Sequence, residues 1–215
     1  MIFPDFKELL SEFNAHDVKY LIVGGYAVSF HGHPRATKDL DILISPDPEN
    51  ALAVYAALAK FGAPVESLKA EDLTEPDSFF RMGTPPVMVD ILPRISGIDF
   101  DDAWQHRVNF EVDDTLTVSL ISRDDLLVAK IAAGRPQDLA DVADLREAQL
   151  ALADEQQPPS SNAADSIEEL QRKGRERWLE RLPIDSQHVP DSPNPTDGKD
   201  PQKSIEHDLD HDLEP

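Results

Sequence analysis

The chain has 215 residues, no cysteine, and 42 acidic against 20 basic side chains, which give a formal net charge of −22 at pH 7. The lack of cysteine excludes disulfides and thiolate-bound metals, and the acidic excess opposes non-specific binding of nucleic acid while leaving room for a local basic cleft. No apolar run approaches the ~20 residues of a membrane span and the N-terminus shows no signal-peptide pattern, so we expect a soluble, cytoplasmic protein without a membrane partner.

The first elements expected are a helix, a strand and a short second helix. Apolar residues at helical spacing predict an amphipathic helix over residues 4–13, and residues 20–23 form a short apolar strand. Gly24 and Gly25 end this strand and open a helix over residues 26–30. Glycines let the backbone approach a ligand, and the N–H groups at a helix start favour an anion such as phosphate.

The second strand carries two aspartates. A loop over residues 32–38 leads into an apolar strand over residues 40–44, with Asp39 directly before it and Asp41 inside it. Because residues i and i+2 of a strand point to the same face, the two carboxylates should lie side by side. Two like charges so close are costly unless a cation lies between them, so the pattern predicts a metal ion here.

Further helices and strands follow from periodicity and from residues that start and stop helices. Asp47 and Ser122 are helix starts, the second with Asp125 in a capping box, and Gly62 and Gly134 are helix ends. The expected helices cover residues 48–61, 123–133 and 136–150, and the expected strands cover residues 79–82, 87–92, 108–112 and 116–120.

The composition changes after residue 152. We assign residues 1–152 to one α/β (α+β) domain, a mixed β-sheet flanked by helices with a helical C-terminal part. Residues 153–182 have the composition of a linker and a charged helix. Residues 183–215 are rich in proline, aspartate and histidine and poor in apolar residues, which is typical of a disordered acidic tail.

A third carboxylate, Asp90, lies in the middle of the apolar strand over residues 87–92. Charges rarely lie in such strands unless they are paired or bind a metal, and an all-oxygen donor set favours Mg²⁺ or Mn²⁺. Two such ions can bind a triphosphate, polarise its α-phosphorus and activate an attacking hydroxyl. Together with the glycine pair, Asp39, Asp41 and Asp90 supply the minimum groups for phosphoryl or nucleotidyl transfer.

Each acid also has a structural interpretation. Asp39 would then be a charge at a strand edge, Asp41 would pair with Arg35 or Lys38, and Asp90 would be an ion-pair partner. The three acids together with the glycine pair favour the catalytic interpretation over three separate structural ones.

Two segments resemble a known family. Gly24-Gly25, then Arg35-Ala-Thr37-Lys-Asp39-Leu-Asp41, then a lone Asp90 on an apolar strand resemble the minimal nucleotidyltransferases of the DNA polymerase beta superfamily. The downstream segment Lys130-Ile-Ala-Ala-Gly-Arg135-Pro-Gln-Asp138-Leu-Ala-Asp141 is similar to the motif of the abortive-infection (type IV toxin) branch. The resemblance covers about residues 18–150 and implies a nucleotidyltransferase-like fold.

The resemblance also implies residue roles. Asp39 and Asp41 would bind the catalytic metals, and Asp90 would complete the metal site and help deprotonate the acceptor hydroxyl. The nucleotide-binding residues expected from the resemblance or from their place in the loop are Gly24, Gly25, Arg35, Thr37, Lys130 and Arg135. Lys130 either lies beside the core or reaches the cleft, whereas Asp138 and Asp141 suit the dipole at the start of their helix.

The leading hypothesis is a metal-dependent nucleotidyltransferase that moves a nucleoside monophosphate from a triphosphate to an acceptor hydroxyl. The acceptor would be an RNA end such as that of tRNA, a protein or a small molecule, and a toxin role would add an antitoxin protein as partner. The alternative is a non-catalytic binding module of the same fold that acts in a partner complex. A third hypothesis, an unrelated α/β metal-dependent hydrolase, does not explain Gly24 and Gly25.

Overall fold

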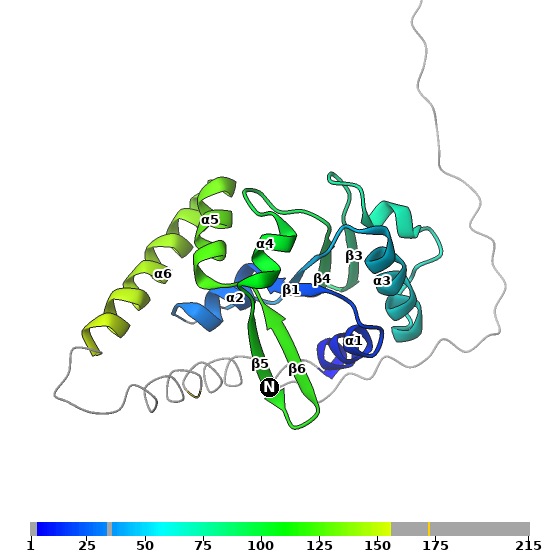
Figure 1. Cartoon of the computed structure of the whole chain (residues 1–215), viewed down its shortest axis with the longest axis horizontal. Coiled ribbons are helices and arrows are strands. Elements are labelled where there is room, and N and C mark those ends of the chain that lie inside the picture. Colours follow the sequence, from blue (N-terminus) through cyan, green and yellow to red (C-terminus); the bar gives the residue numbers. More distant parts are fainter. Residues whose placement is uncertain (1–3, 34–35, 156–171, 173–215) are drawn as a thin grey trace, which may run out of the picture. The chain divides into compact units, whose positions relative to one another are not determined.

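The computed structural model describes residues 4–33 and 36–155 and residue 172. Helices lie on both sides of one mixed sheet, which confirms the expected α/β class (Figure 1). The helices are α1 (Pro4–Ala15), α2 (Gly24–His31), α3 (Pro48–Phe61), α4 (Phe100–Gln105), α5 (Arg123–Ala133) and α6 (Pro136–Glu155), with a 3₁₀ turn η1 (Ala70–Leu73). The strands are β1 (Tyr20–Val23), β2 (Leu40–Ile44), β3 (Phe80–Thr84), β4 (Val87–Leu92), β5 (Val108–Asp113) and β6 (Leu116–Leu120).

The six strands follow the order β3-β4-β2-β1-β6-β5. β1 pairs antiparallel with β2 and parallel with β6, and β2 pairs parallel with β4. The two outer pairs, β3 with β4 and β5 with β6, are antiparallel hairpins. The strand with the aspartate pair therefore lies directly beside the strand with the third aspartate.

Alternation along the strands divides the core into two layers. Tyr20 and Ile22 of β1 face α1 and α3, whereas Leu21 and Val23 face the apolar side chains of α2, α4, α5 and α6. In β2 the same alternation turns the apolar residues on either side of Asp41 toward α1 and α3. Asp41 therefore points to the α5 and α6 side of the sheet.

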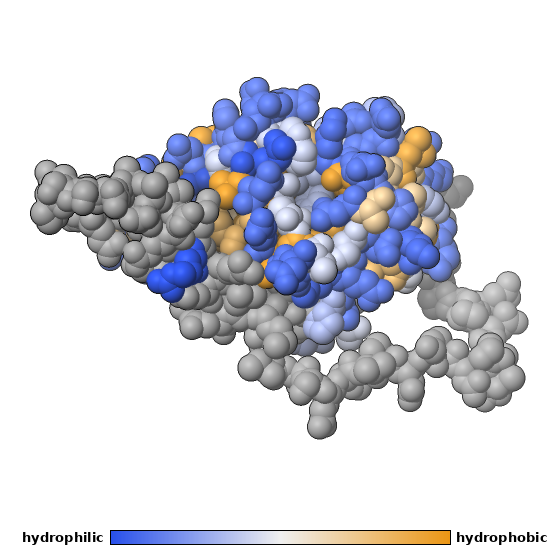
Figure 2. Space-filling view, turned by 60° about the horizontal axis from the view of Figure 1, so that its bottom comes forward, coloured by the Kyte–Doolittle hydropathy of each residue, from blue (hydrophilic) through white to orange (hydrophobic). Residues whose placement is uncertain are grey.

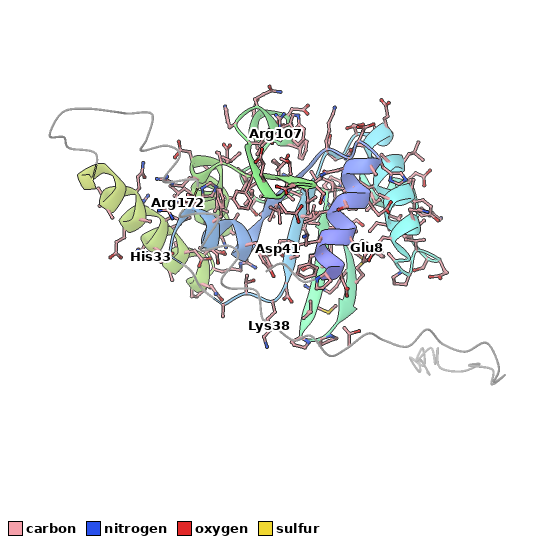
Figure 3. The ribbon with its side chains drawn as sticks, turned by 90° about the horizontal axis from the view of Figure 1, so that it is seen from below. Glu8, His33, Lys38, Asp41, Arg107 and Arg172 are labelled. Carbon is pink, nitrogen blue, oxygen red and sulfur yellow. The ribbon has the colours of Figure 1, made fainter. Side chains whose placement is uncertain are left out.

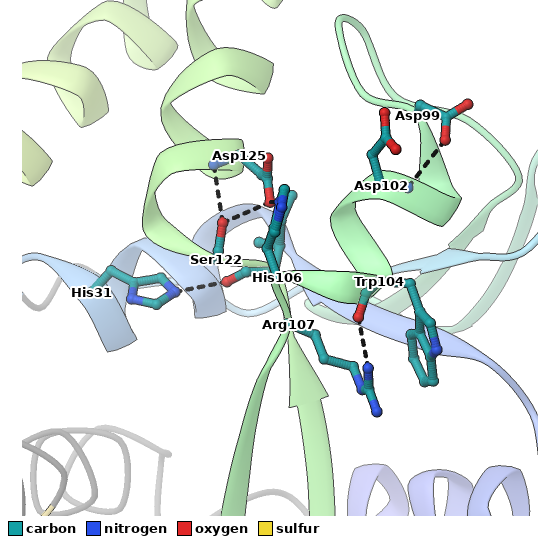
Figure 4. A network of polar contacts seen from close by, with 9 residues as sticks. His31, Asp99, Asp102, Trp104, His106, Arg107, Ser122 and Asp125 are labelled. Atoms are coloured by element: carbon teal, nitrogen blue, oxygen red, sulfur yellow. Dashed lines mark hydrogen bonds and ion pairs between the residues drawn. The ribbon is translucent and has the colours of Figure 1, made fainter.

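The start of α5 is fixed by a polar network (Figure 4). Ser122 Oγ accepts from the backbone N–H of Asp125 at 3.1 Å and donates to its carboxylate at 2.6 Å, and His106 Nδ1 lies 3.2 Å from the same carboxylate. Burial lowers the pKa of His31 to about 4, so its neutral ring donates from Nε2 to the carbonyl oxygen of Ile121 at 2.7 Å. The capped start predicted for this helix is confirmed, and it fixes the helix that carries Lys130.

Several boundaries differ from those predicted. β3 extends to Thr84, so the hairpin turn is the pair Pro85-Pro86 rather than residues 83–86. α4 and η1 were not expected because each is too short to show periodicity, and Asp99 caps α4 by accepting from a backbone N–H at 3.1 Å. α6 continues to Glu155, past the helix end predicted at about residue 150. The predictions for residues 156–171 and 173–215 lie outside the described residues.

The surface in Figure 2 is mainly hydrophilic, with apolar side chains in separate small groups. The large apolar side chains exposed on described residues are Leu52, Phe79, Val128, Ile131, Leu139 and Leu150. Scattered exposure of this kind is ordinary for a globular domain. Among the described helices, none combines the length and apolar character needed to cross a bilayer.

Candidate active site

The turn from β1 into α2 is built around the Asp41 carboxylate. Gly24 has a φ of 60°, in the left-handed region, and a Cβ added to it would overlap the carboxylate of Asp41. The residue before α2, Val23, provides no side-chain cap, and the backbone N–H of Gly25 donates to the Asp41 carboxylate instead. Asp41 thus caps α2 from a neighbouring strand, and glycine at position 24 is needed for this close approach.

Three aspartates lie together on the α5 and α6 side of the sheet, and we call Asp39, Asp41 and Asp90 the carboxylate row. Asp41 is the register partner of Val23 in β1 and of Asp90 in β4. Asp39 precedes Asp41 by two residues and therefore points to the same side. Figure 3 places Asp41 beside the start of α2, while Lys38 points away from it. The side-by-side arrangement expected from the sequence is present.

The carboxylate row is electrostatically unfavourable for its central member. Burial, and after it the negative charges of Asp90 and Asp39, raise the pKa of Asp41 to about 6. The N–H of Gly25 and the ammonium of Lys130 act in the opposite direction without cancelling the shift. A carboxylate in this state gains from a nearby divalent cation.

Arg81 is a member of the site that the sequence reasoning missed. Its Nε and Nη2 donate to the two carboxylate oxygens of Asp90, each at 2.6 Å, in a bidentate pair. Arg81 and Asp90 are register partners across the β3–β4 hairpin. The signal that could have found Arg81 is the hairpin register, because a two-residue turn at Pro85-Pro86 places residues 81 and 90 opposite each other.

A second group of charges lies where α5 meets α6, and we call Lys130, Arg135, Asp138 and Asp141 the helical corner. Lys130 Nζ donates to Asp138 at 2.9 Å and to Asp141 at 2.8 Å, and all three side chains are buried. Arg135 Nε donates to Asp138 at 2.6 Å. Asp138 and Asp141 therefore bind Lys130, which is a more specific structural role than the helix-dipole role expected for them.

Both charge groups border one cavity of about 740 Å³. This volume is in the range of ~300–1,000 Å³ that small-molecule and cofactor sites occupy. The cavity brings together the predicted site residues that the structure describes: Gly24, Gly25, Thr37, Asp39, Asp41, Asp90, Lys130 and Arg135. Arg35 lies outside the described residues. Of the two positions predicted for Lys130, beside the core or at the cleft, the structure shows that it lines the cavity. Its ammonium group is, however, already bound by two carboxylates.

The donor chemistry of the carboxylate row fits a hard divalent cation. Asp39 and Asp41 offer oxygen ligands, and the raised pKa of Asp41 is the shift that a nearby cation would reverse. Asp90 fits less directly, since both of its oxygens are engaged by Arg81. Within the part of the chain that the structure describes, no three histidine, aspartate or glutamate side chains converge as a ready metal centre.

A family model matches most of the chain, and solved structures match at low identity. Residues 1–151 match a family described as "Nucleotidyltransferase of unknown function (DUF6036)". The crystal structure of the lincosamide antibiotic adenylyltransferase LnuA with lincomycin bound matches at 14% identity, 68% of this chain, 98% of that chain and a TM-score of 0.39. The solution structure of the antibiotic-resistance factor ANT(2'')-Ia matches at 16% identity, 82% of this chain, 92% of that chain and a TM-score of 0.42. A search of curated proteins found no match.

Proposed function

The chain belongs to the DUF6036 family of nucleotidyltransferases, and from that premise we propose that it moves a nucleoside monophosphate from a triphosphate to an acceptor hydroxyl. The observation that carries the proposal is the register of Asp41 beside Asp90, which puts like charges next to each other in a cavity large enough for a nucleotide. Like charges side by side are costly unless a cation offsets them, so the arrangement supports a site for a metal-bound triphosphate.

Asp39, Asp41 and Asp90 would hold the divalent cation, Mg²⁺ or Mn²⁺. When bound, the cation would neutralise phosphate charge, polarise the α-phosphorus and lower the pKa of the acceptor hydroxyl. The acceptor oxygen forms a bond to the α-phosphorus while the bond to the bridging oxygen breaks, and pyrophosphate leaves with the electron pair. Asp90, at the cavity wall, is proposed to take the hydroxyl proton.

The nucleotide would lie between the β1–α2 turn and the helical corner. Gly24, Gly25 and Thr37 border the cavity and would lie along the triphosphate. Arg35, two residues before Thr37 in the sequence, is a further proposed phosphate contact. Arg135 is proposed to contact phosphate, because its side chain is 74% exposed although it also binds Asp138. Lys130 would act by its charge, which already lowers the pKa of Asp41 against the effect of burial.

For the acceptor we propose an RNA end, such as that of tRNA, or a protein hydroxyl. The overall charge of −22 disfavours broad contact with a polyanion, so an RNA would enter by its end only. A toxin role would pair the enzyme with an antitoxin protein, and the proposed location is the cytoplasm. The acceptor is a separate question from the transfer chemistry and is tested separately.

One observation favours the alternative, a binding module of the same fold without turnover. Arg81 neutralises Asp90, and an acid paired in this way does not need a metal. Against this alternative, Asp41 keeps a raised pKa even though Arg81 binds its neighbour. A purely structural ion pair would leave no such unfavourable charge beside it.

The test is transfer of label from each of the four α-³²P nucleoside triphosphates, with Mg²⁺ or Mn²⁺, to total tRNA and to lysate protein. Asp41→Asn should lower labelling by at least about 10³-fold, since it removes a central metal ligand. The matched control is Asp47→Asn. Asp47 caps α3 outside the cavity by accepting from the N–H of Asn50 at 2.8 Å, and asparagine caps equally well, so labelling should not change.

Labelling of RNA alone or of protein alone would identify the acceptor class. If the folded wild-type protein labels nothing with any triphosphate, the transferase proposal is wrong and the binding module is favoured. Equal loss in Asp41→Asn and Asp47→Asn would also contradict the site, because only one of the two aspartates lies in the cavity.

A further inference from the structure

Arg81 occupies an unusual position for a structural ion-pair partner. It lies on β3, the edge strand of the sheet, and its side chain is 53% exposed while that of Asp90 is 10% exposed. Its guanidinium borders the same cavity as the carboxylate row. The exposed ring of Phe79 has its centroid 5.7 Å from the guanidinium carbon. Arg81 can therefore move without unpacking any buried group.

The Arg81–Asp90 pair and a metal ion compete for the same atoms. Nε and Nη2 of Arg81 engage both oxygens of Asp90 at 2.6 Å, which is the short, charge-assisted fork geometry. A cation that recruits Asp90 must take at least one of these oxygens. The guanidinium would then need another partner, since separating it from its carboxylate leaves a charge unpaired beside the cavity.

A triphosphate offers that partner. Phosphate oxygens and carboxylate oxygens present the same planar pair of acceptors to a guanidinium, and a metal-bound triphosphate brings both the cation for Asp90 and the anion for Arg81. We propose that Arg81 is an exchange residue: it neutralises Asp90 in the free protein and transfers to a nucleotide phosphate when the metal–triphosphate complex binds, which releases Asp90 to the metal. This inference rests on the proposed function and adds a nucleotide-binding residue to it.

The exchange makes the metal and the nucleotide depend on each other. A metal ion alone must displace Arg81 from Asp90 without offering it a replacement, so it binds weakly. The metal–triphosphate complex supplies a new partner for Arg81 and therefore binds more tightly than the metal alone. Removing the guanidinium should therefore have opposite effects on the two ligands, whereas a residue that only supports the fold would weaken both.

The experiment measures, by isothermal titration calorimetry, binding of Mn²⁺ alone and of Mn²⁺ with α,β-methylene analogues of the nucleoside triphosphates, which cannot transfer their nucleotide. For Arg81→Gln we expect Mn²⁺ alone to bind about 5- to 30-fold more tightly and the Mn²⁺–analogue complex about 10-fold or more weakly. Arg81→Lys keeps the charge but loses the fork, so both changes should have the same sign and be smaller.

Arg135→Gln is the matched control, because it removes another fork-bonded arginine from the same cavity. Its effect on the affinity for Mn²⁺ alone measures how much the loss of one positive charge near the cavity changes Mn²⁺ binding in general. The exchange requires the effect of Arg81→Gln on Mn²⁺ affinity to exceed that of Arg135→Gln, since of these two arginines only Arg81 binds a carboxylate of the row.

Weaker or unchanged binding of Mn²⁺ alone in Arg81→Gln, or a gain no larger than that of Arg135→Gln, would overturn the exchange and leave the proposed function standing. If the wild-type protein itself binds no Mn²⁺–analogue complex, the proposed function fails first and the exchange with it. Should Arg81→Gln not fold, as judged by its thermal transition, the same comparison is made with Arg81→Lys.

Discussion

The carboxylate row and the helical corner border the same cavity and use the same kinds of charge in opposite ways. In the helical corner two cations alternate with two anions, and Asp138 accepts from both Lys130 and Arg135. In the carboxylate row Asp41 has two negative neighbours, Asp39 and Asp90, and its own hydrogen bond is to a backbone N–H. The corner is electrostatically complementary by itself, whereas the row is not.

The pKa values of two aspartates express this difference. Burial alone would raise the pKa of Asp138, but hydrogen bonds from Arg135 and Lys130 outweigh burial and lower it to about 2. In Asp41 burial and the neighbouring carboxylates act together and raise the pKa to about 6. The corner therefore contributes to stability and the row lowers it, and unfavourable charge of the second kind is typical of functional sites.

The largest expected effect on stability comes from opening the helical corner. Lys130→Met leaves the buried Asp138 and Asp141 without their shared ammonium, and breaking a buried ion pair from one side costs about 3–5 kcal/mol of unfolding free energy. Urea denaturation at pH 7 measures the loss. Lys130→Met combined with Asp141→Asn should regain part of it, because the second change removes one of the unpaired charges.

This result also bears on the comparison itself. A Lys130→Met protein of nearly wild-type stability that has lost nucleotide transfer would mean that the corner, like the row, exists for the ligand. The two regions would then form one catalytic surface rather than a site and its support.

The placement of the carboxylate row could be predicted from the sequence because the patterns that indicate it are local. The i and i+2 spacing of Asp39 and Asp41 sets their common face whatever the rest of the chain does. The parallel neighbour Asp90 was suggested by a charge in an apolar strand, which has few structural interpretations. Local capping chemistry likewise predicted the starts of α3 and α5 at Asp47 and Ser122.

The features that were missed depend on relations between elements. Arg81 meets Asp90 only because the hairpin turns at two residues, and a shift of one residue would place Arg81 on the other face. Lys130 meets Asp138 and Asp141 across the α5–α6 connection, a packing geometry that helical periodicity does not encode. The capping of α2 by Asp41 joins two elements through the sheet register. In each case the residue itself could be read from the sequence, but its interaction partner could not be predicted from it.

A pair of glycines offers the next test, directed at the row. Gly24 and Gly62 both have positive φ, but a Cβ on Gly24 would overlap Asp41, whereas a Cβ on Gly62 would meet nothing within 4 Å. Gly62→Ala should cost about 1–2 kcal/mol of backbone strain and leave transfer intact. Gly24→Ala adds displacement of the carboxylate, so we expect a cost of about 2–4 kcal/mol and loss of transfer.

Thermal or urea unfolding of both variants, with the labelling assay beside it, measures the difference. Equal stability and equal activity of the two variants would show that Asp41 does not need its close approach to the β1–α2 turn. The carboxylate row would then tolerate displacement, contrary to the geometry that carries the proposed function.

The smallest effect expected is a pH dependence with opposite signs in the two regions. The pKa of Asp41 is about 6 in the folded protein and near 4 when unfolded, so the folded state binds the extra proton between these values. Stability from this group is present below pH 4 and is lost as the pH rises to 6, by at most about 3 kcal/mol. For Asp138 the folded pKa is about 2, so its stability is present above pH 4 and is lost as the pH falls toward 2.

Urea denaturation from pH 2 to 7 separates these contributions, because the remaining charges are common to every variant and cancel in the differences. Asp41→Asn should become more stable relative to the wild type as the pH rises from 4 to 6 and keep that advantage above pH 6. Asp138→Asn should become less stable relative to the wild type as the pH rises from 2 to 4, and the difference should stay constant above pH 4. Mn²⁺ added at pH 7 together with an α,β-methylene triphosphate analogue should narrow the gap by stabilising the wild type and not Asp41→Asn, since a cation bound to the row offsets the repulsion that the substitution removes. If the Asp41→Asn difference were flat from pH 4 to 7, Asp41 would carry no unfavourable charge, and the contrast between row and corner would disappear.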